Sequence, residues 1–286
     1  MKALQDKARV LIEALPYLRK FSGKTIVIKY GGAAMTEAGL KESVAQDLVL
    51  LKTVGLNVVV VHGGGPEISD AMKKQGKQPV FQGGLRVTDA ETMAITEMVL
   101  VGKVNQQITG FMNRHGHVAA GLSGKDGHLL EARKLKAKVD LGFVGEVVKV
   151  NTAILEALQS RGFIPIIAPV AMGKDGEAYN CNADLVAGAV AAALKAEKLV
   201  MMTDQPGLLR DVKDPNSLIA SVKAGDVPRL KKQGIIDKGM LPKMEACLTA
   251  LKAGVGKVHV IDGRVHHALL LEIFTDSGIG TEIVRG

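Results

Sequence analysis

Residues 57–66 read NVVVVHGGGP, a run of four valines that leads through a histidine into three glycines and a proline. A short β-branched run without polar interruption is typical of a strand buried on both faces of a parallel sheet. Pro66 suits the first position of a helix, where its missing N–H removes no hydrogen bond. The segment therefore predicts a buried strand, a glycine loop and the start of a helix in direct succession.

A similar succession begins earlier, at residues 25–32, TIVIKYGG, where Lys29 precedes the glycines. Further apolar runs alternate with segments of helical composition. We expect strands at 25–29, 57–61, 118–121, 164–170, 198–203 and 257–261, and helices at 40–54, 89–114, 153–161, 183–196 and 240–253. This alternation predicts an α/β protein with a mainly parallel sheet covered by helices on both sides. Residues 123–148 contain four glycines and no helical pattern, so we expect a β-hairpin there.

The length of 286 residues and the hydrophobic content of 47% are those of a globular protein of about two domains, or of one large α/β unit. The two cysteines, Cys181 and Cys247, form no CxxC pair. This usage fits a reducing compartment and gives no indication of zinc or iron–sulfur chemistry. We expect no dedicated metal site built from protein side chains.

The N-terminal segment and the charge distribution bear on location and on partners. No apolar run reaches the 18 or so residues that a bilayer span requires, and acidic residues interrupt the first 20 residues, so we expect a cytosolic protein. The net charge of +8 could indicate nucleic acid as a partner. However, the chain has no Trp, 3 Tyr and 6 Phe with which to stack bases, and its basic runs are short. We expect neither nucleic acid nor a membrane as a partner.

The two glycine loops follow strands, at the sheet edge where open parallel sheets bind ligands. Glycines at that edge let backbone N–H groups approach phosphate oxygens. The GKT at residues 23–25 precedes a strand, so it is no Walker loop, and no GxGxxG follows a strand. The HGGG at residues 62–65 matches an esterase oxyanion motif, but the chain has no GxSxG nucleophile elbow. Phosphate binding without a dinucleotide fold is the remaining interpretation.

Seven segments in chain order together resemble the N-acetylglutamate kinase branch of the amino acid kinase family. They are KYGG at 29–32, HGGGP at 62–66, GLRVT at 84–88, GKVN at 102–105, YNCNAD at 179–184, TD with Gly207 at 203–207, and GM with Lys243 at 239–243. The resemblance implies a three-layer αβα sandwich with an extra N-terminal helix. It also implies a helical arm at 1–20, a lobe at 21–195 for the amino-acid substrate and for dimerisation, and a lobe at 196–286 for ATP and an arginine site.

The implied activity is ATP-dependent phosphorylation of the γ-carboxylate of N-acetyl-L-glutamate in arginine biosynthesis. A carboxylate is already ionised near neutral pH, so the reaction needs charge neutralisation and alignment rather than a general base. The resemblance gives the catalytic role to Lys29 and Lys243, with Asp184 holding both. It gives substrate binding to Gly64, Gly65, Arg86 and Asn180, and nucleotide binding to Gly31, Gly32, Thr203, Asp204, Gly207, Gly239 and Met240. Mg²⁺ is expected on the phosphate oxygens of ATP.

The ends of the chain resemble those of family members that L-arginine inhibits. Apolar residues recur at helical spacing at Leu4, Ala8, Leu11, Leu15 and Leu18, with Pro16 expected to kink the helix. Such a stripe would either pack on its own domain or pair with another subunit, giving a hexamer built as a trimer of dimers. By pattern alone, the expected arginine-site residues are Tyr17, Lys213, His267, Glu272, Gly278 and Gly280.

Two other functions stay open at this stage. One is a sister kinase for another acidic amino-acid derivative or for carbamate. The other is a catalytically silent subunit that senses nucleotides. The sequence also leaves open whether a signalling protein docks on the enzyme.

Overall fold

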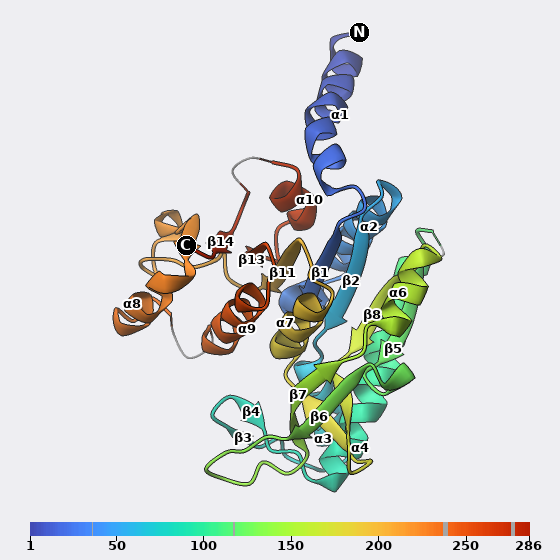
Figure 1. Cartoon of the computed structure of the whole chain (residues 1–286), viewed down its shortest axis with the longest axis vertical. Helices are drawn as coiled ribbons and strands as arrows, with labels where there is room; N and C mark the ends of the chain where they lie inside the picture. The colour runs from blue at the N-terminus through green and yellow to red at the C-terminus, as the bar shows by residue number, and fades with distance from the viewer. Residues whose placement is uncertain (36, 117, 237–239, 276–277) are drawn as a thin grey trace.

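The computed structural model describes residues 1–35, 37–116, 118–236, 240–275 and 278–286. Its centre is an eight-stranded sheet, whose strands lie across the middle of the molecule in Figure 1. In spatial order its strands are β12 (Ser221–Lys223), β14 (Thr281–Val284), β13 (Lys257–Asp262), β11 (Lys198–Thr203), β1 (Thr25–Tyr30), β2 (Asn57–His62), β8 (Ile164–Ala168) and β5 (Ala119–Ser123). The pairings from β13 through β5 are all parallel, and β14 runs antiparallel to β13.

Helices cover both faces of this sheet because alternate residues of each strand face opposite sides. Val27 belongs to the core under one layer, whereas Ile26 and Ile28 belong to the core under the other. The first layer contains α6 (Ala153–Ser160), α7 (Ala183–Ala193), α8 (Val227–Lys232) and α9 (Leu241–Lys252). The second contains α2 (Ala38–Thr53), α3 (Gly65–Lys74), α4 (Ala90–Glu97), η2 (Met98–Asn105), α5 (Gln106–Asn113) and α10 (Ala268–Ile273). The predicted αβα sandwich is confirmed.

Both glycine loops lie at the carboxyl end of the sheet. The β1 loop continues into a short 3₁₀ helix, η1 (Gly32–Met35), and the β2 loop leads directly into α3, which has Pro66 in its first turn. Three further single-turn helices are η3 (Asp126–His128), η4 (Pro215–Ser217) and η5 (Ala224–Asp226). β1 pairs with β2 on one side and with β11 on the other, so the sheet is continuous across the predicted lobe boundary at residues 195 and 196. The functional division into lobes stays a prediction.

A second, smaller sheet stands beyond the carboxyl end of the main one. The hairpin expected within 123–148 is confirmed as β6 (Leu130–Lys134) and β7 (Val144–Val150), and these strands close a four-stranded barrel with β9 (Val170–Gly173) and β10 (Ala178–Cys181). The strand expected at 164–170 is in fact two strands that meet at Pro169, because proline cannot donate to a strand ladder. A short hairpin of β3 (Phe81–Gln82) and β4 (Leu85–Arg86) was not expected from the sequence.

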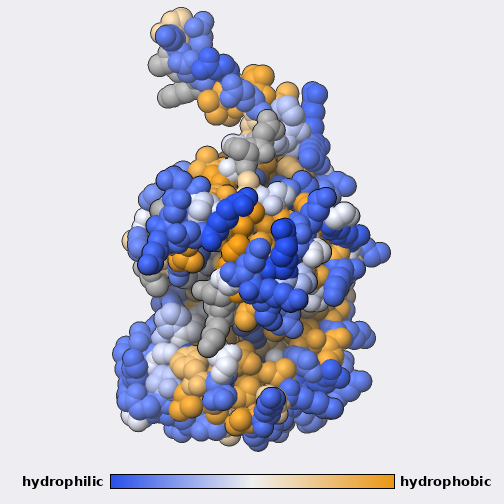
Figure 2. All heavy atoms as spheres, turned by 90° about the vertical axis from the view of Figure 1, so that its left-hand side faces the viewer, coloured by the Kyte–Doolittle hydropathy of each residue, from blue (hydrophilic) through white to orange (hydrophobic). Residues whose placement is uncertain are grey.

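The first helix, α1 (Lys2–Phe21), stands clear of the body as an arm (Figures 1 and 2). The base of the arm is anchored through Phe21, which is 2% exposed, and through Tyr17, which packs against the core. Leu4, Leu11 and Leu15 of the predicted stripe are exposed, Leu11 at 72%. The stripe therefore does not pack on this subunit. No helix in the described part of the chain is both long and apolar enough to cross a bilayer.

Candidate active site

Three charged side chains from distant parts of the chain meet at the carboxyl end of the sheet. Lys29 lies near the end of β1, Asp184 lies in the first turn of α7, and Lys243 lies in the first turn of α9. The Nζ atom of Lys29 is 3.2 Å from Oδ1 of Asp184, and the Nζ atom of Lys243 is 2.8 Å from Oδ2. One carboxylate thus holds both amines, as the sequence analysis expected.

The backbone around this group explains how the three side chains reach one point. Asn182 caps α7, its Oδ1 accepting hydrogen bonds from the N–H groups of Asp184 and Leu185 at 2.9 and 3.2 Å. The cap fixes the first turn of α7 and so the position of the carboxylate. A Cβ atom on Gly31 would lie 2.6 Å from Nζ of Lys29. Glycine at this position therefore leaves the space that the amine fills.

Burial and pairing act against each other on the ionisation of this group. Burial lowers the pKa of Lys29, with the nearby Lys243 adding to the effect and Asp184 opposing it. For Asp184, burial opposes ionisation, but the charges of Lys29 and Lys243 outweigh it and hold its pKa below the ordinary value. Asp184 is thus a carboxylate at neutral pH, and the site carries two cationic groups against one anion.

A cavity of about 210 Å³ lies beside the glycine loop of β2. It is lined by all four residues predicted to bind substrate, Gly64, Gly65, Arg86 and Asn180. Asn180 belongs to β10 of the small barrel and donates to Oγ1 of Thr88 at 3.2 Å. The cavity therefore lies between the main sheet, the barrel and the β3–β4 hairpin.

Arg86 is buried and tied to the start of α3. Its Nη2 donates to the carbonyl oxygen of Gly65 at 2.8 Å and to Oγ of Ser69 at 2.9 Å. Its guanidinium lies 4.7 Å from the ring centre of Phe81 in β3. These contacts hold the planar group in one orientation while other N–H donors of the fork remain for a ligand.

Most of the described residues predicted to bind nucleotide lie at the ends of β1 and β11 or in the loops that follow them, and Met240 lies at the start of α9. Oδ1 of Asp204 accepts a hydrogen bond from the N–H of Ala33 at 2.6 Å, so the two loops are joined. Gly32 has φ of 71°, and a Cβ there would lie 2.3 Å from the same oxygen, so only glycine fits. Thr203, Gly207 and Met240 are buried, and Gly239 lies outside the described residues.

The residues predicted to bind arginine fall into separate groups. Glu272, Gly278 and Gly280 come together: the Glu272 carboxylate accepts the N–H of Gly280 at 3.2 Å, and a Cβ on Gly278 would lie 2.7 Å from it. Its other oxygen pairs with His259 of β13, and its pKa stays below the ordinary value because these hydrogen bonds outweigh burial.

The other members of that predicted set lie on different elements. The backbone N–H of His267 donates to Oγ of Ser43 at 2.6 Å, and its Nδ1 lies 2.6 Å from Oδ1 of Asp47. His267 thus joins the start of α10 to α2. Tyr17 packs against the core near the base of the arm. Lys213 lies exposed in the loop after β11, and within the described ranges no ion pair joins it to Glu272.

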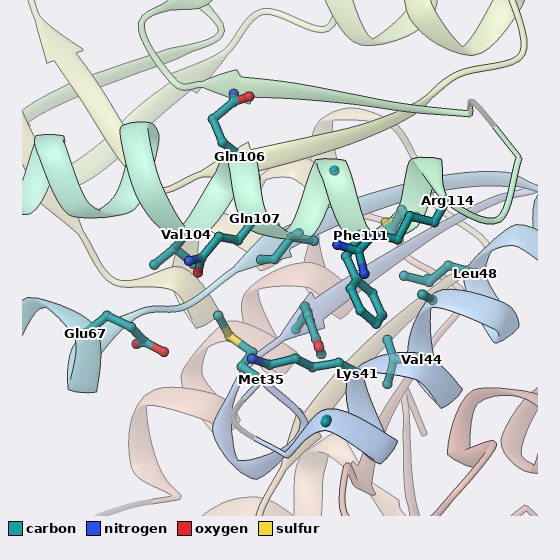
Figure 3. Close-up of a pocket in the computed structure, with 16 residues that line it drawn as sticks. Met35, Lys41, Val44, Leu48, Glu67, Val104, Gln106, Gln107, Phe111 and Arg114 are labelled. Atoms are coloured by element: carbon teal, nitrogen blue, oxygen red, sulfur yellow. The ribbon is translucent and has the colours of Figure 1, made fainter.

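A larger cavity of about 610 Å³ lies between α2 and α5 (Figure 3). Val44, Leu48 and Phe111 give it an apolar wall, and Lys41, Glu67 and Arg114 supply its charges. None of the predicted site residues lines it. The smaller cavity, with its converging donors, is the candidate site for the reaction.

Sequence reasoning assigned no role to several polar residues that the structure places at or near these sites. Ser69 supports Arg86, and His259 holds Glu272. Lys198, at the start of β11, lies 4.9 Å from the ring centre of Phe21. His62 and Asn105 lie buried under the glycine loop. His62 lies in the HGGGP segment and Asn105 in the GKVN segment of the family resemblance, and this membership was the only indication of a role in the sequence.

Comparison with known proteins identifies the family of the chain and its class of enzyme. The model of the amino acid kinase family matches residues 24–262, so the chain belongs to that family. Acetylglutamate kinase of Moorella thermoacetica is 54% identical over 290 residues, covering 98% of each chain. This full-length similarity places the chain among the acetylglutamate kinases, enzymes that transfer a phosphoryl group to a carboxyl acceptor.

Solved structures extend the similarity. N-acetylglutamate synthase from Neisseria gonorrhoeae, complexed with coenzyme A and N-acetyl-glutamate, superposes with a TM-score of 0.86 at 27% identity. The match covers 98% of this chain and 63% of the synthase. The same synthase complexed with coenzyme A and L-arginine gives a TM-score of 0.81 at 27% identity, over 98% and 65% of the two chains.

Proposed function

We propose that the protein transfers the γ-phosphoryl group of ATP to the γ-carboxylate of N-acetyl-L-glutamate, in the cytoplasm and as part of arginine biosynthesis. The observation that carries the proposal is the Asp184 carboxylate held between Lys29 and Lys243, with distances of 3.2 and 2.8 Å. Two oriented cations suit a transition state whose negative charge spreads over the transferred oxygens. The names of the full-length relatives support this choice of substrate.

The substrate cavity supplies the remaining requirements of this reaction. Arg86 can receive the α-carboxylate of the amino acid, because its guanidinium is already fixed by Gly65 and Ser69. Asn180 can bond the substrate's other polar groups, and the N–H of Gly64 can reach a charged oxygen. Alignment of the two substrates, rather than proton transfer, then provides the rate enhancement.

We assign nucleotide binding to Gly31 and Gly32 after β1, to Thr203 at the end of β11 with Asp204 and Gly207 in the loop that follows, and to Met240 at the start of α9. Gly239, also predicted for this role, lies outside the described residues. The described residues contain no group of three carboxylate, histidine or cysteine side chains that could hold a metal ion. Both oxygens of Asp184 face lysine amines, at 3.2 and 2.8 Å. We assign Mg²⁺ to the phosphate oxygens of ATP, where it neutralises phosphate charge.

A substrate panel tests the proposal against its alternatives. The protein is incubated with Mg-ATP and N-acetylglutamate, glutamate, aspartate or carbamate, and hydroxylamine traps any acyl phosphate. We expect hydroxamate from N-acetylglutamate. Product from another acceptor alone would indicate a sister kinase, and no product from any of them would indicate a silent nucleotide-sensing subunit.

We also propose that L-arginine inhibits the enzyme at the C-terminal cluster. The Glu272 carboxylate, which now pairs with His259 and accepts from the N–H of Gly280, would receive the guanidinium, with Gly278 beside it. Tyr17, Lys213 and His267 are the other residues predicted for this site. The structure of N-acetylglutamate synthase in complex with L-arginine supports the choice of L-arginine as the effector.

The exposed arm supports a hexamer built as a trimer of dimers. Leu4, Leu11 and Leu15 would be buried if arms of neighbouring dimers paired, which removes apolar surface from water. We expect deletion of residues 1–20 to leave an active dimer with weakened arginine sensitivity, measured by light scattering and inhibition curves. A full-length dimer indifferent to millimolar arginine would exclude both proposals.

A further inference from the structure

His62, the last residue of β2, is completely buried beneath the glycine loop, with 0% of its surface exposed. Its Nδ1 lies 2.7 Å from the carbonyl oxygen of Gly63, and its Nε2 lies 3.2 Å from Nδ2 of Asn105. Asn105 is 1% exposed and ends the π-helical segment η2. Burying two polar side chains costs free energy unless their hydrogen bonds are satisfied, so the donors and acceptors around this pair determine its state.

The surroundings of Asn105 decide which nitrogen of His62 carries the proton. Nδ2 of Asn105 lies 2.8 Å from the carbonyl oxygen of Ile166 and 3.3 Å from that of Leu122. Carbonyl oxygens only accept, so the atom that faces them is the NH₂ group. The same group faces Nε2 of His62, and a nitrogen that faces a donor carries no proton, so the two hydrogens of the NH₂ group are shared among three acceptors. A neutral imidazole then carries its proton on Nδ1, directed at the Gly63 carbonyl.

The imidazole is neutral under working conditions. Burial lowers the pKa of His62 to about 4, partly opposed by the hydrogen bond to Gly63. The ring therefore donates from Nδ1 and accepts at Nε2 across the neutral pH range.

The direction of the Gly63 carbonyl sets the direction of the next N–H. In a trans peptide the C=O and N–H groups point to opposite sides, and the described peptide bonds include no cis bond. Because the Gly63 carbonyl points to the buried ring, the N–H of Gly64 points away from it. The N–H of Gly63 is also fixed, since it donates to the carbonyl of Tyr30 at 2.8 Å.

Gly64 lines the 210 Å³ substrate cavity, and among the described residues its N–H has no acceptor. We propose that Asn105 and His62 are positioning residues for phosphoryl transfer, which aim the Gly64 N–H at the oxygen on which negative charge develops. The proposal rests on the function proposed above and adds two residues to it. Neither residue touches the substrates; each acts through the peptide that joins Gly63 and Gly64.

Two substitutions at position 62 separate positioning from packing. His62→Leu fills the same space without a donor, whereas the amide of His62→Asn can place an N–H near the former Nδ1. Loss of one oxyanion donor lowers kcat by about 10²–10³-fold, and a misdirected donor should cost less. We expect His62→Leu to lower kcat about 10- to 100-fold, with both KM values within about threefold, and His62→Asn to recover most of the loss. Equal kcat in the two variants, or a loss confined to KM, would overturn the proposal.

Asn113 provides a matched control on the same helical run. Like Asn105 it joins the helix to β5, accepting from the N–H of Ala119 at 2.8 Å and donating to its carbonyl at 3.0 Å, but these contacts do not involve His62. Asn105→Ala should lower both the melting temperature and kcat, and Asn113→Ala only the melting temperature. An equal fall in kcat for both would show a structural effect and contradict the proposal.

The tautomer can be measured without any assay of activity. In ¹⁵N-labelled full-length protein, the imidazole nitrogens of His62 should show a protonated Nδ1 and an unprotonated Nε2, unchanged between about pH 6 and 8. A proton on Nε2, or titration in that range, would overturn the proposal even if a variant fails to fold. If the wild-type protein makes no acyl phosphate, the proposed function fails while this measurement still decides the hydrogen-bond chain.

Discussion

Replacement of Asp184 by asparagine tests the electrostatic design of the site most directly. The change keeps the shape of the side chain but removes the one anion between Lys29 and Lys243. The buried Lys29 can escape the resulting repulsion by releasing its proton. Deprotonation of an ordinary lysine, with a pKa of about 10.4, costs roughly 4 kcal/mol at pH 7.5. This cost is an upper limit on the loss of unfolding free energy. Because burial already lowers the pKa of Lys29, we expect Asp184→Asn to lower the unfolding free energy by about 2 to 4 kcal/mol.

The same substitution should alter catalysis in a way that simple destabilisation cannot. With Asp184 gone, the pKa of Lys29 falls further, so the alkaline limb of the kcat profile should move to lower pH. At neutral pH we expect kcat to fall about 10²–10³-fold, the usual effect of losing one charge-stabilising group. Denaturant unfolding and pH-dependent initial rates measure the two effects. The control is Glu97→Gln, which breaks the half-exposed 2.7 Å pair with Lys125 and should cost under about 1 kcal/mol. A kcat within tenfold of wild type and an unmoved alkaline limb would refute the reasoning.

Three further substitutions have distinct expected results. Lys243→Met should lower kcat by about 10²–10³-fold and leave the melting curve nearly unchanged, because Asp184 keeps Lys29 as a partner; a kcat within tenfold would remove Lys243 from the mechanism. Arg86→Lys should raise KM for the amino acid about tenfold or more and spare that for ATP, since a point charge cannot replace the guanidinium fork; an equal rise for ATP would misplace Arg86. Burial raises the pKa of the unexposed Asp47 to about 6, so its native state binds more protons than the unfolded chain between about pH 4 and 6. Ionisation of that carboxylate therefore destabilises the fold as pH rises. Denaturant titration should show that the unfolding free energy of Asp47→Asn, relative to wild type, increases by about 3 kcal/mol from pH 4 to pH 7. A difference that does not depend on pH would contradict this.

The sequence alone predicted the parts of the fold that depend on local pattern. The valines of β2 and the TIVIK segment of β1 are strands because β-branched runs suit a sheet buried on both faces. Pro169, which divides the strand expected at 164–170, was a readable signal that the prediction did not use. The π-helical turn at 98–105 was not readable, because its residues fit the pattern of an ordinary helix equally well.

The site was less accessible to local reasoning. Asp184 and Lys243 are 59 residues apart, and no spacing rule brings them together, so their expected meeting came from the resemblance. His62 and Asn105 are 43 residues apart, and their contact becomes visible only once β2 and η2 are packed together. Glu272 was predicted as an arginine-site residue, and its pairing with a histidine and with backbone N–H groups could not be read from the sequence.

The charged group at the carboxyl end of the sheet contains more positive than negative charge, and this imbalance affects both folding and the attraction of phosphate. Lys29, Asp184 and Lys243 place two positive charges against one negative charge in a largely buried group. Burial lowers the pKa of Lys29, and the nearby Lys243 adds to the effect. A fully balanced pair would fold more favourably but would attract a phosphate less. The unbalanced positive charge costs stability, and under the proposed function the phosphates of ATP would supply the anion that offsets this cost. The buried His62–Asn105 pair differs because it is uncharged, so it can orient the loop without altering that balance.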